Sequence, residues 1–168
     1  MPKRGQLFLW SGTNVIARGI QLFTSPPWSH TGFFLDSDTI IDSDWDWDPN
    51  NLGVQVRDAK VYLDNPGRLE LIDLPFSEKE IELILKKAES YVGSLYDIPL
   101  IFSWVYKIWK GSQSFNSMFH LPKAMTCSEF VAQCIYDATG HEVIKNTPPH
   151  GIQPGDLLEL ENVKRSSN

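Results

Sequence analysis

The chain has 168 residues, of which 42% are hydrophobic and 21% are charged. This composition is typical of a globular protein, and the length fits one domain rather than two. The formal net charge of −6 excludes a general nucleic-acid-binding protein, because such a protein presents a basic face to the phosphates.

The first half of the chain is dominated by short strand patterns. Runs of alternating or β-branched residues bounded by turn residues predict five strands, the last with imperfect alternation. They are expected over residues 6–10, 31–35, 39–42, 53–57 and 68–74. Between the first two strands, residues 14–23 predict a short amphipathic helix or turn.

Two helices are predicted in the second half, and each begins with a capping box. The first follows the N-cap Ser77, with a glutamate three residues later, and should end at the C-cap Gly93. The second follows Thr126 in the same way and should end at Gly140. Residues 153–160 predict a turn into a last strand. We expect one α+β domain over residues 1–161 and a polar tail over residues 162–168.

No cofactor and no metal are expected. The two cysteines, Cys127 and Cys134, are too far apart along one helix for a disulfide and too few for a structural zinc site. The run Asp44-x-Asp46-x-Asp48 resembles the start of a calcium loop, but it lacks the glycine and the glutamate that such a loop needs. A solvated hairpin loop is the favoured interpretation of this run, with recognition of a cationic substrate group as the alternative.

The location of the protein is predicted to be cytoplasmic. The N-terminus lacks the apolar run of a signal peptide, and residues 98–109 are too short to span a bilayer. We favour a buried helix for residues 98–109. The alternatives are an apolar wall for an acyl chain or a contact with a membrane surface.

A cysteine at the start of a helix is a candidate nucleophile. The free backbone N–H groups and the dipole at a helix N-terminus favour a thiolate at Cys127, although a buried structural role is an equal alternative. A nucleophilic thiol also needs a histidine within reach. His141 lies too far along the same helix, and His30 opens a predicted strand that would fix its ring. His120 remains open as a candidate, and His150 follows two prolines in a turn.

Several motifs occur in the order found in one family. They are Pro2-Lys-Arg-Gly-Gln-Leu-Phe-Leu9, Ser29-His30-Thr31-Gly32, Gly93-Ser-Leu-Tyr-Asp97, Thr126-Cys-Ser-Glu-Phe-Val131 and Pro154-Gly-Asp-Leu-Leu158. In this set and order the chain resembles the circularly permuted branch of the NlpC/P60 superfamily, the YaeF/YiiX-type cysteine hydrolases. The resemblance implies a circularly permuted papain-like fold, in which an antiparallel sheet or half-barrel packs against helices.

The resemblance also implies a catalytic triad. Cys127 would be the nucleophile and His30 the base. The family often carries a glutamate on the strand after the histidine, and Asp42 occupies that place here, with Asp44 as the fallback. The residues expected to contact the substrate are Trp28, Ser29, Tyr96 and Ser128.

The resulting hypothesis is a cysteine peptidase or amidase that cleaves an amide bond in a peptide, such as a cell-wall peptide. One alternative keeps the chemistry and changes the substrate, giving a thioesterase or acyltransferase that acts on lipid acyl groups. The other is an inert binding module with the same fold. The expected partner is a peptide or acyl-amide substrate and not a nucleic acid.

Overall fold

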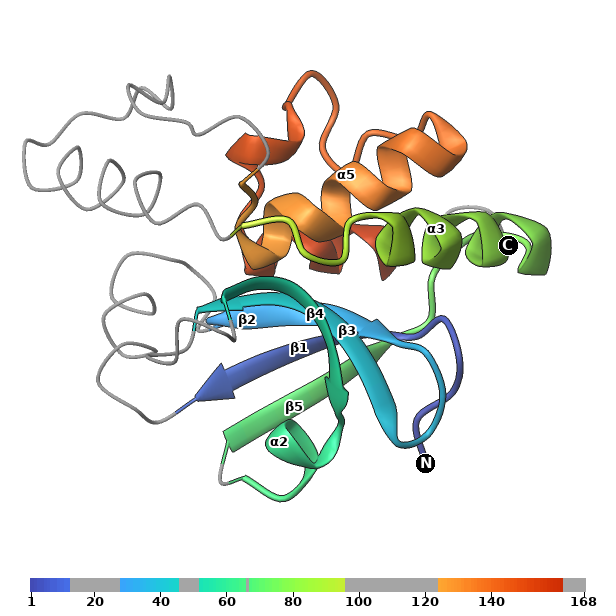
Figure 1. The fold of residues 1–168 in the computed structure, drawn as a ribbon. Helices are drawn as coiled ribbons and strands as arrows, with labels where there is room; N and C mark the ends of the chain where they lie inside the picture. Colours follow the sequence, from blue (N-terminus) through green and yellow to red (C-terminus); the bar gives the residue numbers. More distant parts are fainter. Residues whose placement is uncertain (13–27, 46–51, 66, 96–123, 162–168) are drawn as a thin grey trace, which may run out of the picture.

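The computed structural model describes residues 1–12, 28–45, 52–65, 67–95 and 124–161. It has an α+β architecture, in which helices pack on an antiparallel five-stranded sheet (Figure 1). The strands are β1 Leu7–Gly12, β2 His30–Phe34, β3 Thr39–Trp45, β4 Leu52–Asp58 and β5 Gly67–Ile72. The helices are α2 Lys60–Leu63, α3 Glu78–Ser90 and α5 Cys127–Thr139, with the 3-10 helices η2 Pro149–Gly151 and η3 Pro154–Leu158.

The sheet has the strand order β4-β3-β2-β1-β5. All five predicted strands are present, with their ends shifted by at most three residues. The pairs Trp10↔His30 and Gly32↔Asp42 set the register of β2 against its two neighbours. The edge strand β4 lies against β3 over its full length, where Gln55 is the partner of Asp42.

Each face of the sheet buries its own apolar cluster, because successive strand residues point to opposite faces. Leu7 and Leu9 of β1 belong to the larger cluster, which includes buried residues of α3 and α5. Phe8 belongs to a smaller cluster on the other face, which Tyr62 of α2 helps to cover. In Figure 1, α3 and α5 lie together on one side of the sheet and α2 lies on the other.

Both predicted N-caps are confirmed. Ser77 and Thr126 each accept a hydrogen bond from the backbone N–H three residues on, and the glutamate there bonds back to the cap. The C-cap of α5 is Gly140, which has a left-handed φ of 73°, as expected. The predicted C-cap of α3 was wrong, because the helix ends at Ser90 with Tyr91 as its C-cap, and Gly93 lies in the turn that follows.

Two further elements differ from the prediction. Residues 153–160 form no strand; they contain η3, in which Pro154 occupies the first turn and Asp156 accepts from the backbone N–H of Gln153 at 2.8 Å. This cap stabilises a helical turn, which buries Leu157, and Leu160 just after η3 is also buried. The helix α2 was missed because four residues are too few for a helical period to show.

Among the described residues, no helix is both long enough and apolar enough to cross a membrane. The predicted helix or turn over residues 14–23 and the apolar stretch over residues 98–109 lie outside the described residues.

The conformation of Gly53 predicts a severe cost for a side chain. Gly53 has a φ of +96°, and a Cβ built there would lie 1.9 Å from the carbonyl oxygen of Ser94. Gly93 has a φ of +87° but no atom within 4 Å of such a Cβ. Gly93→Ala should therefore lower the free energy of unfolding by about 1–2 kcal/mol, through the positive φ alone. Gly53→Ala should lower it by about 1–3 kcal/mol more, because the clash adds to that cost.

Urea unfolding of both variants measures this difference, and the slope with denaturant checks that the transition is unchanged. Equal losses in the two variants would contradict the role assigned to the Ser94 contact.

Candidate active site

Cys127 is the first residue of α5 and is almost fully buried, with 4% of its surface exposed. The segment before it is held from two sides. The Ser43 hydroxyl of β3 donates to the Met125 carbonyl at 2.7 Å, and the Met125 N–H donates to the Leu95 carbonyl at 2.8 Å. The start of α5 is therefore attached to the sheet directly before Cys127.

The His30 ring pairs with an acid and lies near this thiol. Its Nε2 is 2.9 Å from Oδ2 of Asp42, and Cys127 is near enough to interact with the ring electrostatically. An ionised carboxylate can only accept, so Nε2 carries a hydrogen and Nδ1 is the nitrogen left for the thiol. Oδ1 of Asp44 lies 3.9 Å from Nδ1, beyond hydrogen-bonding distance. The structure thus brings together Cys127, His30 and Asp42, with Asp44 beside them.

Gly32 provides the space through which Asp42 reaches His30. Gly32 is the cross-strand partner of Asp42 and lies two residues after His30, on the same face of the sheet. A Cβ at this position would lie 2.7 Å from the Asp42 Cβ and 2.8 Å from the Phe8 ring. The glycine of the Ser-His-x-Gly motif therefore has a steric reason.

Asp42 is fully buried, and both oxygens of its carboxylate accept hydrogen bonds from other side chains. Arg57 of β4 donates to Oδ1 from Nε at 3.2 Å and to Oδ2 from Nη2. The Tyr62 hydroxyl of α2 donates to Oδ2 at 2.9 Å. Arg57 also pairs with Asp44, whose Oδ2 lies 2.9 Å from Nη2. The Tyr62 ring stacks on the His30 ring with the centroids 5.2 Å apart.

The electrostatics of this cluster favour a charged histidine. Burial lowers the pKa of His30, but the charges of Asp44 and Cys127 and the hydrogen bond to Asp42 outweigh it, and the net pKa is raised well above its ordinary value. Burial raises the pKa of Asp42, whereas the bonds and charges of His30 and Arg57 lower it more strongly, so the carboxyl is held as an anion. Burial and the nearby carboxylates raise the pKa of Tyr62, so its hydroxyl remains a donor.

Three of the predicted substrate-contact residues lie in the described part of the chain, and each has a structural partner there. Trp28 is 2% exposed and packs in the larger core cluster, with the Arg68 guanidinium 4.7 Å above its ring. The Ser29 hydroxyl accepts from the Gly12 N–H at 3.2 Å. The Ser128 hydroxyl donates to the Ile152 carbonyl at 2.6 Å. These contacts give the three side chains structural roles, and a contact with substrate stays a prediction. Tyr96 lies outside the described residues.

The two other histidines in the described part of the chain lie outside this cluster. His141 lies after α5, with its ring 5.5 Å from that of Phe76, and its Nε2 is buried without a partner. His150 lies in η2, and His120 lies outside the described residues.

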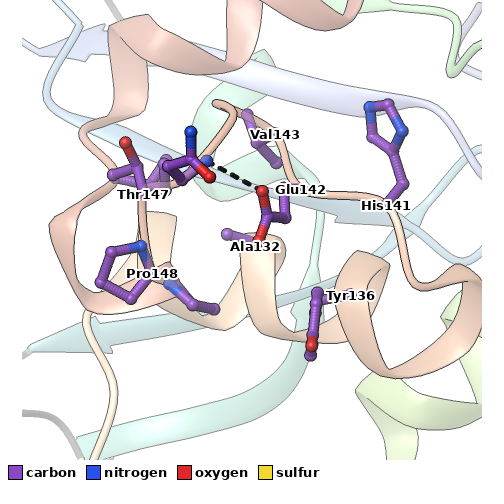
Figure 2. A pocket seen from close by; sticks show the side chains of 10 residues that line it. Ala132, Tyr136, His141, Glu142, Val143, Thr147 and Pro148 are labelled. Atoms are coloured by element: carbon purple, nitrogen blue, oxygen red, sulfur yellow. Dashed lines mark hydrogen bonds between the residues drawn. The ribbon is translucent and has the colours of Figure 1, made fainter.

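A separate cavity of about 440 Å³ lies between α5 and the segment that follows it (Figure 2). Glu142 accepts from the Asn146 N–H at 2.8 Å at its edge. Its lining residues are Ala132, Tyr136, His141, Glu142, Val143, Asn146, Thr147, Pro148, Pro149 and Ile152. None of the cluster around His30 is among them, so this cavity is not the space in front of the thiol.

Sequence reasoning missed Arg57 and Tyr62. Arg57 lies on the face of β4 that carries Gln55, the cross-strand partner of Asp42, so the strand pattern held a signal for it. Tyr62 lies on the helix that the sequence did not reveal, and it gave no such signal.

One group of possible metal ligands exists among the described residues. One ligand atom each from His30, Asp42 and Asp44 lie within 4.8 Å of one another. The guanidinium of Arg57, however, already bonds to both carboxylates. A cation therefore has no free carboxylate pair here, and the group does not fit a metal site while Arg57 is in place.

Comparison with known proteins gives a likeness in fold. No family model matches the sequence, and no curated protein matches it. One similar solved structure is the crystal structure of metalloprotein yiiX from Escherichia coli O157:H7, with a TM-score of 0.59 and 20% sequence identity. The match covers 84% of this chain and 69% of that one, and it supports a shared YiiX-like fold.

The raised pKa of His30 predicts a specific pH dependence of stability. The folded protein binds a proton that the unfolded chain releases near pH ~6.5, so this stabilisation is complete below pH ~6.5 and is lost as the pH rises through the folded pKa. The free energy of unfolding should fall in that window by up to about 1.4 kcal/mol per pH unit. Urea unfolding of the wild type and His30→Gln at several pH values measures it. The prediction fails if the two proteins show the same slope.

The tight environment of Gly32 predicts that Gly32→Ala separates His30 from Asp42. The added methyl group must push β2 away from β3, which lengthens the 2.9 Å bond and lowers the pKa of His30. The His30 pKa can be measured from the imidazole ¹⁵N shifts as a function of pH. Gly140→Ala is the control, because no atom lies within 4 Å of its Cβ. An unchanged His30 titration in Gly32→Ala would contradict the steric role.

Proposed function

We propose that this protein is a cysteine hydrolase of circularly permuted papain-like fold. Cys127 is the nucleophile, His30 the general base and acid, and Asp42 the residue that orients His30. The observation that carries the proposal is the placement of the His30 ring, which bonds to Asp42 through Nε2 and interacts electrostatically with Cys127 at the start of α5. Nucleophile, base and orienting acid in this order are the arrangement of papain-like catalysis.

The reaction follows from these positions. Nδ1 of His30 takes the thiol proton, and the thiolate forms a C–S bond to the substrate carbonyl carbon. The oxygen that gains the negative charge faces the free N–H groups at the start of α5, including that of Cys127. The imidazolium returns the proton to the leaving nitrogen or oxygen as that bond breaks. Water, deprotonated by His30, then hydrolyses the thioester and frees Cys127.

The substrate is proposed to be an amide, such as a peptide bond. A thioester or ester of a fatty acyl group is the second candidate, which residues 98–109 favour because they form an apolar-rich stretch. The same thiol chemistry serves both classes. The structurally similar yiiX is named a metalloprotein. In this chain the Arg57 bridge opposes a metal at the acid cluster beside His30.

The proposal predicts that Cys127 is an activated thiol. The rate of alkylation by iodoacetamide should stay high well below pH ~8.5, the ordinary pKa of a thiol, because the His30 imidazolium stabilises the thiolate. In His30→Ala this rate should collapse at neutral pH by about 10- to 100-fold, because the thiol loses its general base. Peptide mass spectrometry measures Cys127 and Cys134 in the same sample.

Cys134 is the internal control, since it is fully buried and burial raises the pKa of its thiol. Cys127→Ser should abolish alkylation at residue 127 and any hydrolysis of amide or acyl-ester substrates. If the alkylation rate of Cys127 depends on pH like that of an ordinary thiol and does not change in His30→Ala, the enzyme proposal is wrong. That result would favour an inert binding module.

A further inference from the structure

Asp42 poses an electrostatic problem that His30 alone does not solve. The carboxylate is 0% exposed, and an uncompensated buried anion is strongly destabilised. In the proposed cycle, which this inference takes as its premise, His30 is cationic in one step and neutral in the next. Because the charge of His30 is lost in part of the cycle, it cannot keep Asp42 ionised in every step. A cation whose charge does not change is therefore needed beside Asp42.

Arg57 is placed to be that cation. Its Nε and Nη2 bond to the two different oxygens of Asp42, which fixes the plane of the carboxylate as well as its charge. The guanidinium is itself largely buried, with 18% of the side chain exposed, so the pairing is weakly screened by solvent. Because Arg57 bonds to the carboxylate that holds His30, it acts on the ring through Asp42.

Tyr62 completes the arrangement from the other side. Its hydroxyl donates to Oδ2 of Asp42 at 2.9 Å, the same oxygen that faces Nε2 of His30. Its ring stacks on the His30 ring at an interplanar angle of 26° and also lies 5.5 Å from the Arg57 guanidinium. One side chain therefore contacts the acid, the base and the cation.

We infer that Arg57 and Tyr62 are positioning residues for the Cys127–His30 pair: Arg57 holds Asp42 permanently as an anion, and Tyr62 fixes both the carboxylate and the His30 ring. Together they keep the hydrogen on Nε2 and leave Nδ1 facing the thiol. Among the described residues, the charged and titratable groups around His30 are then Asp42 and Asp44 from β3, Arg57 from β4, Tyr62 from α2 and Cys127 from α5.

The test compares Cys127 alkylation between about pH 5 and 9 in the wild type, Arg57→Met, Arg57→Lys and Tyr62→Phe. Arg57→Met should slow alkylation by about 10- to 100-fold, because Asp42 loses two charge-assisted hydrogen bonds. Its acidic limb should move to higher pH, since Asp42 takes up a proton more readily. Arg57→Lys should recover part of the rate, because it restores the charge without the two-pronged geometry.

A double-mutant cycle separates positioning from general damage. If Arg57 acts through Asp42, Arg57→Met should change the rate less than about twofold in an Asp42→Asn background. The matched control is Arg4→Met, which removes an exposed pair with Glu82 and should leave the rate unchanged. Circular dichroism checks that each variant is folded. If Arg57→Met is not folded, Tyr62→Phe provides the test, and it should slow Cys127 alkylation by about 3- to 10-fold.

The inference is overturned if Cys127 of Arg57→Met is alkylated as fast as in the wild type while the rate in His30→Ala collapses. It is also overturned if Arg57→Met slows alkylation as much in the Asp42→Asn background as it does in the wild type. If Cys127 is alkylated at the same rate in the wild type and in His30→Ala, the proposed function is overturned instead. In that case the imidazole ¹⁵N spectrum of His30 still decides the inference. The spectrum is recorded at a pH above the His30 pKa, where the ring is neutral. Loss of the Nε2–H tautomer in Arg57→Met then supports the inference, and an unchanged spectrum rejects it.

Discussion

The burial of one carboxylate constrains most of the sheet. Asp42 has no exposed surface, so every partner that stabilises its charge must come from another element. His30 is delivered by β2, Arg57 by β4 and Tyr62 by α2. A slip of one residue in either neighbouring strand would turn one of these side chains to the other face and leave the anion without its partner. The register of β2, β3 and β4 and the position of α2 therefore depend on the Asp42 carboxylate.

The same strand also fixes the thiol, from its opposite face. Ser43 follows Asp42 and therefore points toward the helices, where its hydroxyl holds the carbonyl of Met125 at 2.7 Å. Asp42 meanwhile holds His30. Two adjacent residues of β3 thus position the segment that opens α5 and the His30 ring.

Local chemistry explains where sequence reasoning worked. Ser77 and Thr126 act as N-caps because a capping box needs only residues three apart, and the strands follow from alternation within a few residues. It was wrong for residues 153–160, where a proline and the Gln153–Asp156 cap favour a 3-10 helix over the expected strand. It missed α2, whose four residues are held by packing of Tyr62 on the sheet rather than by a helical pattern.

By itself, the sequence determined the α+β class, the helix that begins at Cys127 and the strand that begins at His30, because these depend on neighbouring residues. Alternation also placed Asp42 and Asp44 on one face but could not choose between them. Only the tertiary structure decided that choice: the register Gly32↔Asp42 brings Asp42 to 2.9 Å from His30 and leaves Asp44 at 3.9 Å. It likewise decided that Arg57 and Tyr62 bind Asp42. Contacts between strands and a distant helix depend on how the elements pack, and no local pattern encodes that.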